Sequence, residues 1–460
     1  MVDAPGVTRA RCRLVARSRP LTGAVNTPDR SAQRRAKTWY GRCTSHRNRK
    51  NESERVRTIS QATEVGVEDV GADFFADPHK YYSAWREKGP VIRVRRPNGM
   101  EHWLITGYEA ARAALADPRM RKNVAGLYEI IRRVAPAGSV GASEALAGHM
   151  LNSDPPEHTR LRKLVSREFT GRRVAALRPR VEEITKNLLD DMEGQDEVDL
   201  IEGLAAPLPV MVICELLGVP FEDRANFQKW SKILLDADPS VDMAAVSKQM
   251  SEYLAGLLTA KRAEPGDDLL SGLVAESEDG DQLTLPELIS MTFLLLVAGH
   301  ETALHLIGNG VFMMLKDQEA LDALRADPDK IPAATEEVLR RFGPVGWATT
   351  RYTGEDVEIA GVTIPEGELV CVSLDAANLD PAVNPESPRL HLVDDNPKHL
   401  AFGHGVHFCL GAPLGRLEAN VAFSQLLERF GGMRLVDPEF TPSWRMSFMR
   451  GFTSLPVRLR

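Results

Sequence analysis

Cysteine is scarce in this chain of 460 residues, which contains only five. Cys12 and Cys43 lie in the first 57 residues, and Cys214, Cys371 and Cys409 are far apart in the sequence. This spacing fits neither a disulfide framework nor a metal-binding cluster of cysteines. We therefore expect the protein to reside in a reducing compartment.

Long hydrophobic runs are also lacking. No apolar stretch approaches the ~18–20 residues that a membrane-spanning helix requires. Hydrophobic residues make up 43% of the chain, which is ordinary for a globular protein with a sizeable core. We expect a cytoplasmic protein that has no membrane anchor.

Positive charge is depleted in most of the chain, although the formal net charge is only −7. The first 57 residues contain fifteen Lys or Arg and four Asp or Glu, which leaves 42 basic and 60 acidic residues for the rest. An acidic body of this kind argues against nucleic acid as the natural partner.

The first 57 residues are rich in Arg, Ser and Thr, and their composition predicts disorder. A basic arm for nucleic acid or membrane and a transit peptide are two alternatives. We favour a third interpretation, a tail that the fold does not need. The expected organisation is a basic extension over residues 1–60 and a single domain over residues 61–460.

Helical patterns dominate that domain. Helices are predicted at 78–88 and 108–116, and residues 156–330 show only helical patterns. Two strands are predicted on either side of the Asn98-Gly99 turn, at 91–94 and 102–106. Three more are predicted later in the chain, at 357–359, 363–364 and 369–373. Residues 119–152 are rich in Gly, Ala and Pro and are expected to form a long loop. The fold class is therefore mainly α with small β-sheets (α+β).

One predicted helix is long and apolar on nearly every side. It begins at the capping box Thr284-Leu285-Pro286-Glu287 and should run to about Lys316, a length of ~45 Å. Because it lacks a polar face, it should cross the interior. Its middle contains Ala298-Gly299-His300-Glu301-Thr302, where a glycine and a carboxylate are both costly in a buried helix.

This costly stretch has two explanations. Glu301 can pair with a nearby arginine and Thr302 can bond the carbonyl one turn back, which are structural roles. However, several local rules broken together more often mark a functional site.

A glycine-rich segment near the C-terminus, Phe402 to Gly411, contains Cys409. An amphipathic helix is predicted directly after Gly411, so Cys409 precedes a helix N-terminus, where unpaired N–H groups and the helix dipole favour a thiolate. A thiolate held in a glycine loop with one open face can serve as the axial ligand of a haem iron.

The order Phe-x-Gly-x-x-x-His-x-Cys-x-Gly resembles the haem-binding loop of the cytochrome P-450 family, the haem-thiolate monooxygenases. The resemblance implies that Cys409 ligates the iron, that His407 bonds a haem propionate, and that Phe402 and Gly403 form the loop beside the cysteine. The stretch from Ala298 to Thr302 is similar to the family's motif on the long helix. There the helix opens beside the haem, Ala298 and Gly299 lie against the cofactor, Thr302 assists oxygen activation, and Glu301 brings protons from solvent.

Further residues match other motifs of the family. Glu337 and Arg340 are similar to its buried Glu-x-x-Arg pair, with Glu336 and Arg341 as an alternative register. Arg351, His158 and Arg162 match groups that bind the haem propionates. Val345, Trp347 and Ala348 are expected to line the substrate pocket together with Ala298, with ordinary core packing as the alternative.

The resemblance implies a cytochrome P-450 fold with haem b between the long central helix and the cysteine loop. The expected reaction inserts one oxygen atom from O2 into a hydrophobic small molecule by hydroxylation or epoxidation, with electrons from NAD(P)H supplied through a ferredoxin and a ferredoxin reductase. The sequence is closest to actinobacterial enzymes that tailor polyketides and macrolides, and terpenoid or steroid-like substrates are alternatives. Other readings are a peroxide-driven peroxygenase, against which Glu301 and Thr302 argue, and a non-catalytic haem sensor. We expect a monomer.

A basic segment is the predicted docking site for the acidic ferredoxin. Residues 159–180 contain a single acid, Glu168, and eight basic residues: Arg160, Arg162, Lys163, Arg167, Arg172, Arg173, Arg178 and Arg180. The alternative is that these charged side chains only form the solvent-exposed face of a helix and bind no partner.

Overall fold

The computed structural model describes residues 65–71, 73–134, 144–167, 169–236, 241–275, 282–384, 390, 397–444 and 449–460. All of them belong to one compact unit, Ala62–Arg460. The extension predicted over residues 1–60 lies outside the described residues.

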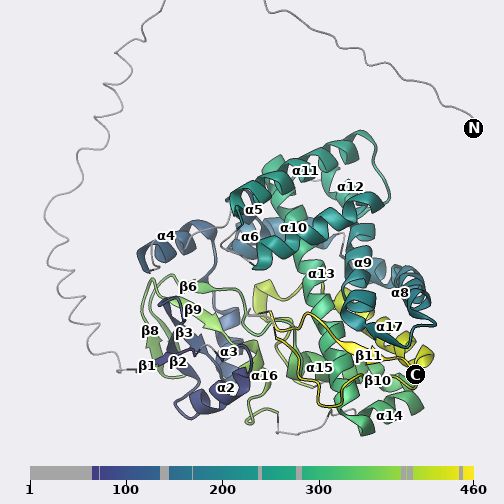
Figure 1. Ribbon diagram of the computed structural model, residues 1–460. Coiled ribbons are helices and arrows are strands. Elements are labelled where there is room, and N and C mark those ends of the chain that lie inside the picture. The colour runs from purple at the N-terminus through teal and green to yellow at the C-terminus, as the bar shows by residue number, and fades with distance from the viewer. Residues whose placement is uncertain are drawn as a thin grey trace, which may run out of the picture. The chain divides into compact units, whose positions relative to one another are not determined.

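Helices make up most of this unit (Figure 1). The α-helices are α2 (Pro78–Arg86), α3 (Tyr108–Ala116), α4 (Val124–Val134), α5 (Glu144–Ala147), α6 (Glu157–Ser166), α7 (Gly171–Ala176), α8 (Arg178–Met192), α9 (Pro207–Leu217), α10 (Arg224–Asp236), α11 (Met243–Ala263), α12 (Leu269–Val274), α13 (Leu285–Lys316), α14 (Gln318–Ala326), α15 (Ile331–Phe342), α16 (Leu374–Asn378) and α17 (Ala412–Arg429). Short 3-10 or π turns are η3 (Met150–Asn152), η4 (Ile201–Ala205), η5 (Phe221–Asp223), η6 (Pro328–Lys330) and η7 (Gly405–His407).

The strands form small sheets, as expected. The largest has the order β1-β2-β3-β9-β6-β4, the second has the order β10-β11-β5, and β7 pairs with β8. Their bounds are β1 (Val67–Asp69), β2 (Val91–Arg95), β3 (Glu101–Ile105), β4 (Met120–Arg121), β5 (Glu197–Asp199), β6 (Arg351–Thr353), β7 (Val357–Ile359), β8 (Val362–Ile364), β9 (Leu369–Val372), β10 (Arg434–Leu435) and β11 (Pro456–Arg458). The predicted hairpin is confirmed: β2 pairs antiparallel with β3, and Gly99 in the turn has φ of +80°.

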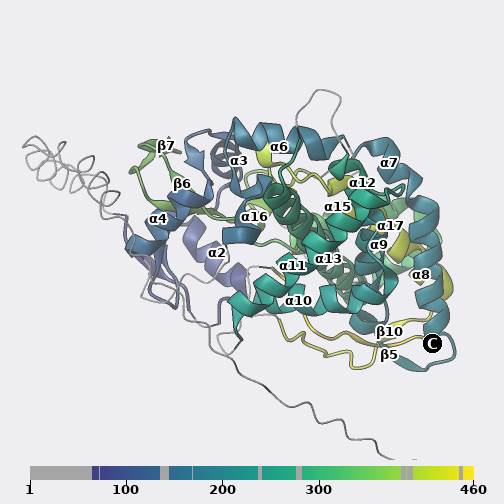
Figure 2. The same cartoon turned by 90° about the horizontal axis from the view of Figure 1, so that it is seen from above.

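The long helix α13 runs through the middle of the helical region (Figures 1 and 2). The predicted capping box is confirmed, because the Thr284 side chain accepts from the Glu287 N–H and the Glu287 carboxylate accepts from the Thr284 N–H. The helix packs against α9, α11, α15 and α17. Contrary to the expectation that no apolar stretch approaches a membrane span, α13 has the length and hydropathy of one. However, 67% of its most apolar stretch is buried, as in the core helix of a soluble protein. The predicted crossing of the interior is therefore confirmed.

Two expectations about secondary structure were wrong. The loop expected over 119–152 contains the eleven-residue helix α4, whose apolar residues Leu127, Ile130, Ile131 and Val134 recur at helical spacing. Among its described residues, the region 156–330 contains one strand, β5, which pairs with the distant β11. This strand depends on a partner far along the chain, whereas α4 has a local helical spacing.

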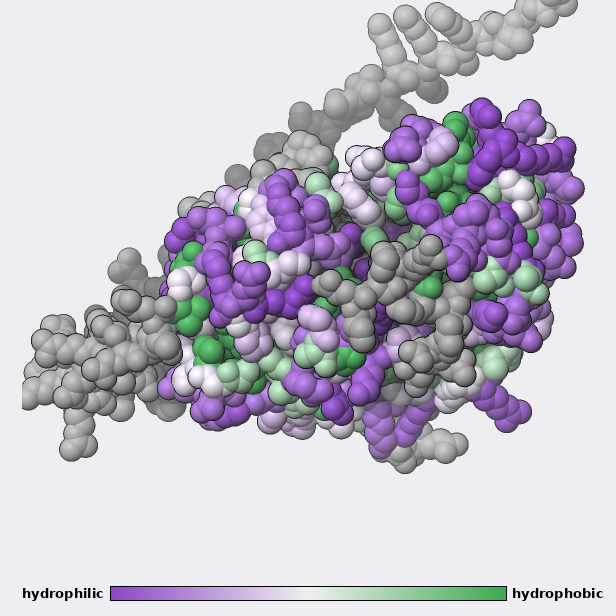
Figure 3. Space-filling view, turned by 90° about the horizontal axis from the view of Figure 1, so that it is seen from below, coloured by the Kyte–Doolittle hydropathy of each residue, from purple (hydrophilic) through white to green (hydrophobic). Residues whose placement is uncertain are grey.

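On the face seen in Figure 3, hydrophobic residues form small separate patches among hydrophilic ones. Two large hydrophobic side chains of the cysteine loop are exposed, Val406 at 53% and Phe408 at 43%. Exposed pairs of this kind are candidates for contact with a partner.

Candidate functional site

The cysteine loop is held in a tight backbone conformation. Gly403 and Gly405 have φ values of +73° and +72°, which glycine adopts without strain. A side chain at Gly405 would also meet the carbonyl oxygen of Leu115 in α3 at 2.8 Å. The Cys409 N–H donates to the Phe402 carbonyl at 2.9 Å, so the loop closes on itself directly before α17. The glycines let the loop turn and lie against α3.

The Cys409 thiol is subject to opposing electrostatic effects. The residue is exposed, yet the surrounding protein atoms desolvate the thiol, and this raises its pKa. The backbone N–H groups of Gly411 and Ala412 and the guanidinium of Arg162 act in the opposite direction. The effect expected from the helix N-terminus is therefore present, but desolvation outweighs it. A thiolate at this position needs a further cation beside it, which a haem iron would supply.

Buried cationic and imidazole groups converge near this loop. His158 on α6 and His407 have ring centroids 4.3 Å apart, and both ring nitrogens of His158 lack a hydrogen-bond partner among the described residues. Arg351 on β6 is 3% exposed, and burial lowers its pKa to about 10. Burial lowers the pKa of His407 to about 2, assisted by the charges of Lys122, His158, Arg351 and Arg162. The four predicted propionate-binding residues are thus brought together by α6, β6 and η7.

Lys122 belongs to this group of cations, and the sequence analysis missed it. It follows β4 directly and is only 1% exposed. A lysine after a short strand is usually a surface residue, so nothing local in the sequence marked it. Buried cations of this kind require anions, and buried imidazoles require hydrogen-bond partners. A flat apolar group with two carboxylates and a thiolate-seeking metal, which is the description of haem, satisfies the donor set.

The middle of α13 is exposed only on one side. Ala298 is exposed although it lies on a core helix, and the Thr302 hydroxyl donates to the Ala298 carbonyl at 2.8 Å. This bond from the Thr302 side chain to the backbone agrees with the structural alternative considered for this stretch. The helix continues through it without the expected opening. Ala298 and Thr302 therefore present an accessible strip of α13.

Glu301 lies on the buried side of the same turn. It is 4% exposed, and its two carboxylate oxygens each lie 3.7 Å from an imidazole Nε2, one of His300 and one of His305. The Nε2 atom of His300 also lies 3.0 Å from the Ser231 hydroxyl on α10. The imidazoles of His300 and His305 therefore flank the buried Glu301 carboxylate.

Gly299 has a packing role besides the predicted contact with the cofactor, which stays a prediction. A side chain at this position would meet Ile213 on α9 at 2.8 Å. The glycine therefore allows α9 and α13 to pack closely.

The Glu337–Arg340 pair is buried as predicted. Glu337 is 1% exposed and Arg340 is 4% exposed, and two parallel bonds of 2.7 Å join them. Arg340 also donates to the Asn378 carbonyl at 3.2 Å, and the Asn378 side chain accepts from the Leu400 N–H at 2.6 Å. The pair thus supports the segment that enters the cysteine loop.

The neighbouring Glu336 supports the other end of that loop. Its carboxylate binds His399 at 3.0 Å and Arg416 on α17 at 2.6 Å. Burial opposes its ionisation, but these two partners together lower its pKa to about 2. The Arg416 guanidinium lies 4.4 Å from the Phe402 ring centroid. Glu336 is therefore not an alternative partner in the Glu-x-x-Arg pair but a second anchor.

The pocket assignment of Trp347 was wrong. Its side chain is 5% exposed, its indole N–H donates to the Tyr82 hydroxyl at 2.9 Å, and its ring contacts Phe74 and His102 in an aromatic core cluster. Val345 and Ala348 are only partly buried and pack against a different cluster.

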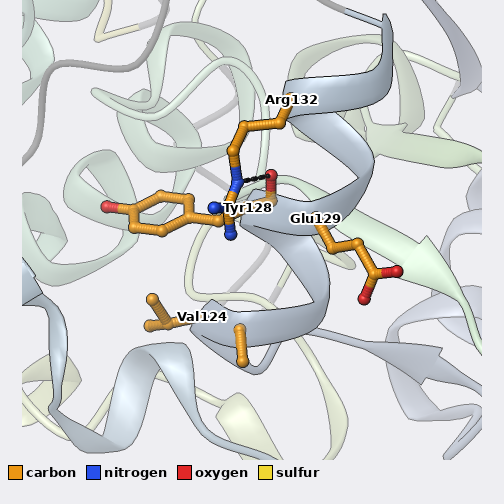
Figure 4. Close-up of a pocket in the computed structure, with 5 residues that line it drawn as sticks. Val124, Tyr128, Glu129 and Arg132 are labelled. Carbon is orange, nitrogen blue, oxygen red and sulfur yellow. Dashed lines mark hydrogen bonds between the residues drawn. The ribbon is translucent and has the colours of Figure 1, made fainter. Parts of the chain in front are cut away.

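A cavity of about 670 Å³ that is widely open to solvent lies along α4, and it is lined by Val124, Ala125, Tyr128, Glu129 and Arg132. Figure 4 shows Val124 and Tyr128 pointing to the same side of α4 and Glu129 pointing in a different direction. The sequence analysis did not identify these residues because it assigned them to a loop. Their spacing of four residues, at Val124, Tyr128 and Arg132, was the signal that could have found them.

Comparison with known proteins gives consistent results. The sequence profile of the cytochrome P-450 family matches residues 240–451. Cytochrome P-450 107B1 of Saccharopolyspora erythraea is 50% identical over 388 residues, which are 84% of this chain and 96% of that protein. The 6-deoxyerythronolide B hydroxylase of the same organism is 42% identical over 402 residues, covering 85% and 99%. The solved structure of the tirandamycin C-bound monooxygenase TamI has a TM-score of 0.79 and 44% identity, covering 85% of this chain and all of that one.

Proposed function

The chain belongs to the cytochrome P-450 family, and from this premise we propose that its haem-dependent monooxygenase activity modifies a polyketide- or macrolide-derived small molecule. The family assignment brings the cofactor haem b, the co-substrate O2 and electrons from NAD(P)H through redox partners. When bound, the haem supplies the oxidising chemistry that places one oxygen atom in the substrate. The protein provides binding, orientation and protons.

The proposed haem-binding residues act from two directions. Cys409 binds the iron from the loop before α17. His158, Arg162, Arg351 and His407 hold the two propionates, and this role is supported by the convergence of these groups beside the loop. Because the carboxylates neutralise buried cations, haem binding relieves a charge imbalance in the protein.

Thr302 and Glu301 are proposed to serve proton delivery. Thr302 lies on the accessible strip of α13 beside Ala298, and Glu301 lies behind it between His300 and His305. In this proposal the Glu301 carboxylate takes up protons on the side of His300 and His305 and passes them to the accessible side of α13 at Thr302. This relay favours O2 as the oxidant over hydrogen peroxide, which already carries its protons.

The substrate proposal is carried by the cavity along α4. Its volume of about 670 Å³ suits a medium-sized organic molecule, and its lining combines Val124 and Tyr128 with the charged Glu129 and Arg132. Relatives are named as a hydroxylase of 6-deoxyerythronolide B and as a hydroxylase/epoxidase of mycinamicin IV. We propose that Val345, Ala348 and Ala298 complete the pocket.

A spectral binding screen tests the substrate class. Purified enzyme is titrated with macrolides, linear polyketides, terpenoids, steroids and fatty acids, and displacement of the iron-bound water is followed by absorbance. Polyketide-derived compounds are expected to bind about tenfold tighter than the other classes, a difference of about 1.4 kcal/mol. Val124→Trp should weaken this binding by filling the cavity, whereas Val362→Trp on β8 should not. Saturable binding of a steroid or fatty acid, with none by any polyketide, would overturn the assignment.

The proposed electron donor is an acidic ferredoxin served by a ferredoxin reductase. Ion pairs neutralise part of the positive charge of the basic segment 159–180. Arg160 binds Glu157 and Glu287, and Arg180 binds Glu183 and Glu215. Arg162 turns inward and donates to the Phe408 carbonyl at 2.7 Å. The docking site is therefore proposed at Arg172 on α7 together with exposed Val406 and Phe408 of the cysteine loop.

Reduction by ferredoxin should slow as ionic strength rises, because salt screens exposed charges over ~8–10 Å. Arg172→Glu should slow reduction at low salt by about tenfold, mainly through association, and the difference should shrink at high salt. Lys248→Glu, on exposed α11, is the control of equal charge change. Equal rates for all three proteins at every salt concentration would exclude this docking site.

We further propose that residues 61–460 act as one monomeric domain in the cytoplasm, with residues 1–60 as an extension. Support comes from the relatives above, which align with 84–85% of the chain over nearly their whole length. An enzyme that lacks residues 1–60 should therefore retain its haem.

A further inference from the structure

Lys122 places a buried amino group where the described residues offer little to neutralise its charge. The residue is 1% exposed, and the one hydrogen bond of its Nζ atom that the structure describes is to the neutral Thr349 hydroxyl, at 2.6 Å. Burial lowers the pKa of Lys122 well below its usual value, and the charge of Arg351 lowers it further. A hydroxyl does not replace the hydration shell of an ammonium ion, so this arrangement is costly as it stands.

The carboxylate that most favours the charged form of Lys122 already accepts other hydrogen bonds. Asp154 is the group whose charge favours the Lys122 ammonium. Its two oxygens, however, accept from the backbone N–H groups of Lys122 and Asn123 and from the Asn123 side chain, at 2.7–3.2 Å. The positive charge of Lys122 also helps to lower the pKa values of His149, His158 and His407. The Nζ atom therefore lies in a region with a local excess of positive charge.

Lys122 is also joined to the wall of the cavity. The next residue, Asn123, caps α4: its side-chain oxygen accepts from the Gly126 N–H at 2.9 Å, and its carbonyl accepts from the Leu127 N–H at 3.0 Å. The first helical residue after this cap, Val124, lines the cavity. The position of Lys122 is thus coupled through the cap residue Asn123 to the start of α4 at Val124.

We propose that Lys122 forms an ion pair with a haem propionate and thereby fastens the start of α4, the wall of the substrate cavity, to the cofactor. This inference rests on the proposed function, since it requires haem in the site. The ion pair supplies the missing anion for a buried cation, and the cap at Asn123 passes the constraint to Val124 and Tyr128. Haem binding and the shape of the pocket are then coupled.

The test compares two cofactors in two proteins. Wild-type enzyme and Lys122→Met, in which a side chain of similar length lacks the charge, are each loaded with haem or with haem dimethyl ester, whose propionates are neutral. Haem loss to apomyoglobin and hydrogen exchange of the α4 amides are then measured. Lys261→Met, which breaks an ion pair with Asp268 elsewhere in the fold, is the control for general destabilisation.

With natural haem, Lys122→Met should lose the cofactor about tenfold faster than wild type, because a charged hydrogen bond is lost. The α4 amides of residues 124–134 should also exchange faster. With the dimethyl ester, the two proteins should lose the cofactor at the same rate. In wild type alone, esterification should speed exchange in α4, a result that does not depend on the folding of the variant.

An equal effect of Lys122→Met with both cofactors would show that the lysine acts only through packing, and it would overturn the proposal. Unchanged exchange in α4 on esterification of wild-type haem would do the same for the coupling. Failure of wild type to bind haem through Cys409 would instead reject the proposed function, so the two failures are distinguishable.

Discussion

Replacing Cys409 with histidine is expected to abolish the long-wavelength absorption band of the reduced carbon monoxide complex. That band reports a thiolate ligand, which donates charge to the iron as an imidazole does not. Turnover should fall by more than about a hundredfold. Mutation of a residue that only hydrogen-bonds a metal ligand commonly lowers metal affinity or activity by about 10–100-fold, and the ligand itself should matter more. Absorbance of the reduced complex and product formation measure the two effects.

The matched control for this variant is Cys371→Ser. Cys371 is buried in β9 at 1% exposure and is not part of the cysteine loop. This control should keep the band and most of the activity, and circular dichroism should show that both variants are folded. Persistence of the band in Cys409→His would end the assignment of the iron ligand.

Breaking the Glu337–Arg340 pair on one side should be the most destabilising single change proposed. Arg340→Met leaves a carboxylate that is 1% exposed without its two 2.7 Å bonds, and such a change typically costs about 3–5 kcal/mol. We expect the free energy of unfolding to fall by that amount and the fraction of enzyme with bound haem to fall with it. Denaturant titration and the haem-to-protein absorbance ratio measure both.

The double variant Glu337→Met with Arg340→Met separates charge from packing. Because it removes both charges together, it should be considerably more stable than the sum of the single changes predicts. Breaking the exposed Lys248–Glu252 pair on α11 should have no measurable effect. Additive losses at Glu337 and Arg340 would show that the pair is not coupled.

The parts of the fold that the sequence predicted correctly were those with local signals. The capping box at Thr284 determined where α13 begins, and the Asn98-Gly99 turn identified the hairpin. The two glycines at positive φ gave the cysteine loop its shape, and their spacing around Cys409 is a local feature. Each of these signals lies within a few residues of the structure that it specifies.

The parts that were missed depend on distant contacts. Trp347 lies in a segment that was expected to line the substrate pocket, and only the structure reveals its aromatic partners Phe74 and Tyr82. Gly299 matched a motif, whereas the need for glycine there comes from Ile213 on α9. Lys122 had no local mark at all, because its burial results from packing of β4 against segments more than thirty residues away.

Composition was misleading in two places. Gly, Ala and Pro between residues 119 and 152 suggested a loop and hid α4, although its four-residue spacing was visible. The charge count over residues 159–180 ignored acids on other elements, such as Glu287 on α13 and Glu215 on α9. Both errors came from counting residue types without asking which face or partner each residue meets.

The proposed haem site combines widely separated parts of the chain, and this bears on when the enzyme can mature. Lys122, His158 and Arg162 are synthesised early, Arg351 later, and Cys409 with its anchor Arg416 near the end. At about 5–20 residues per second, ribosomes need roughly 15–60 s to make the nearly 300 residues between Lys122 and Cys409. During that interval the groups proposed to bind the propionates exist without the proposed iron ligand, Cys409. If these roles hold, cofactor capture is a late event, and haem supply must match the output of finished chains.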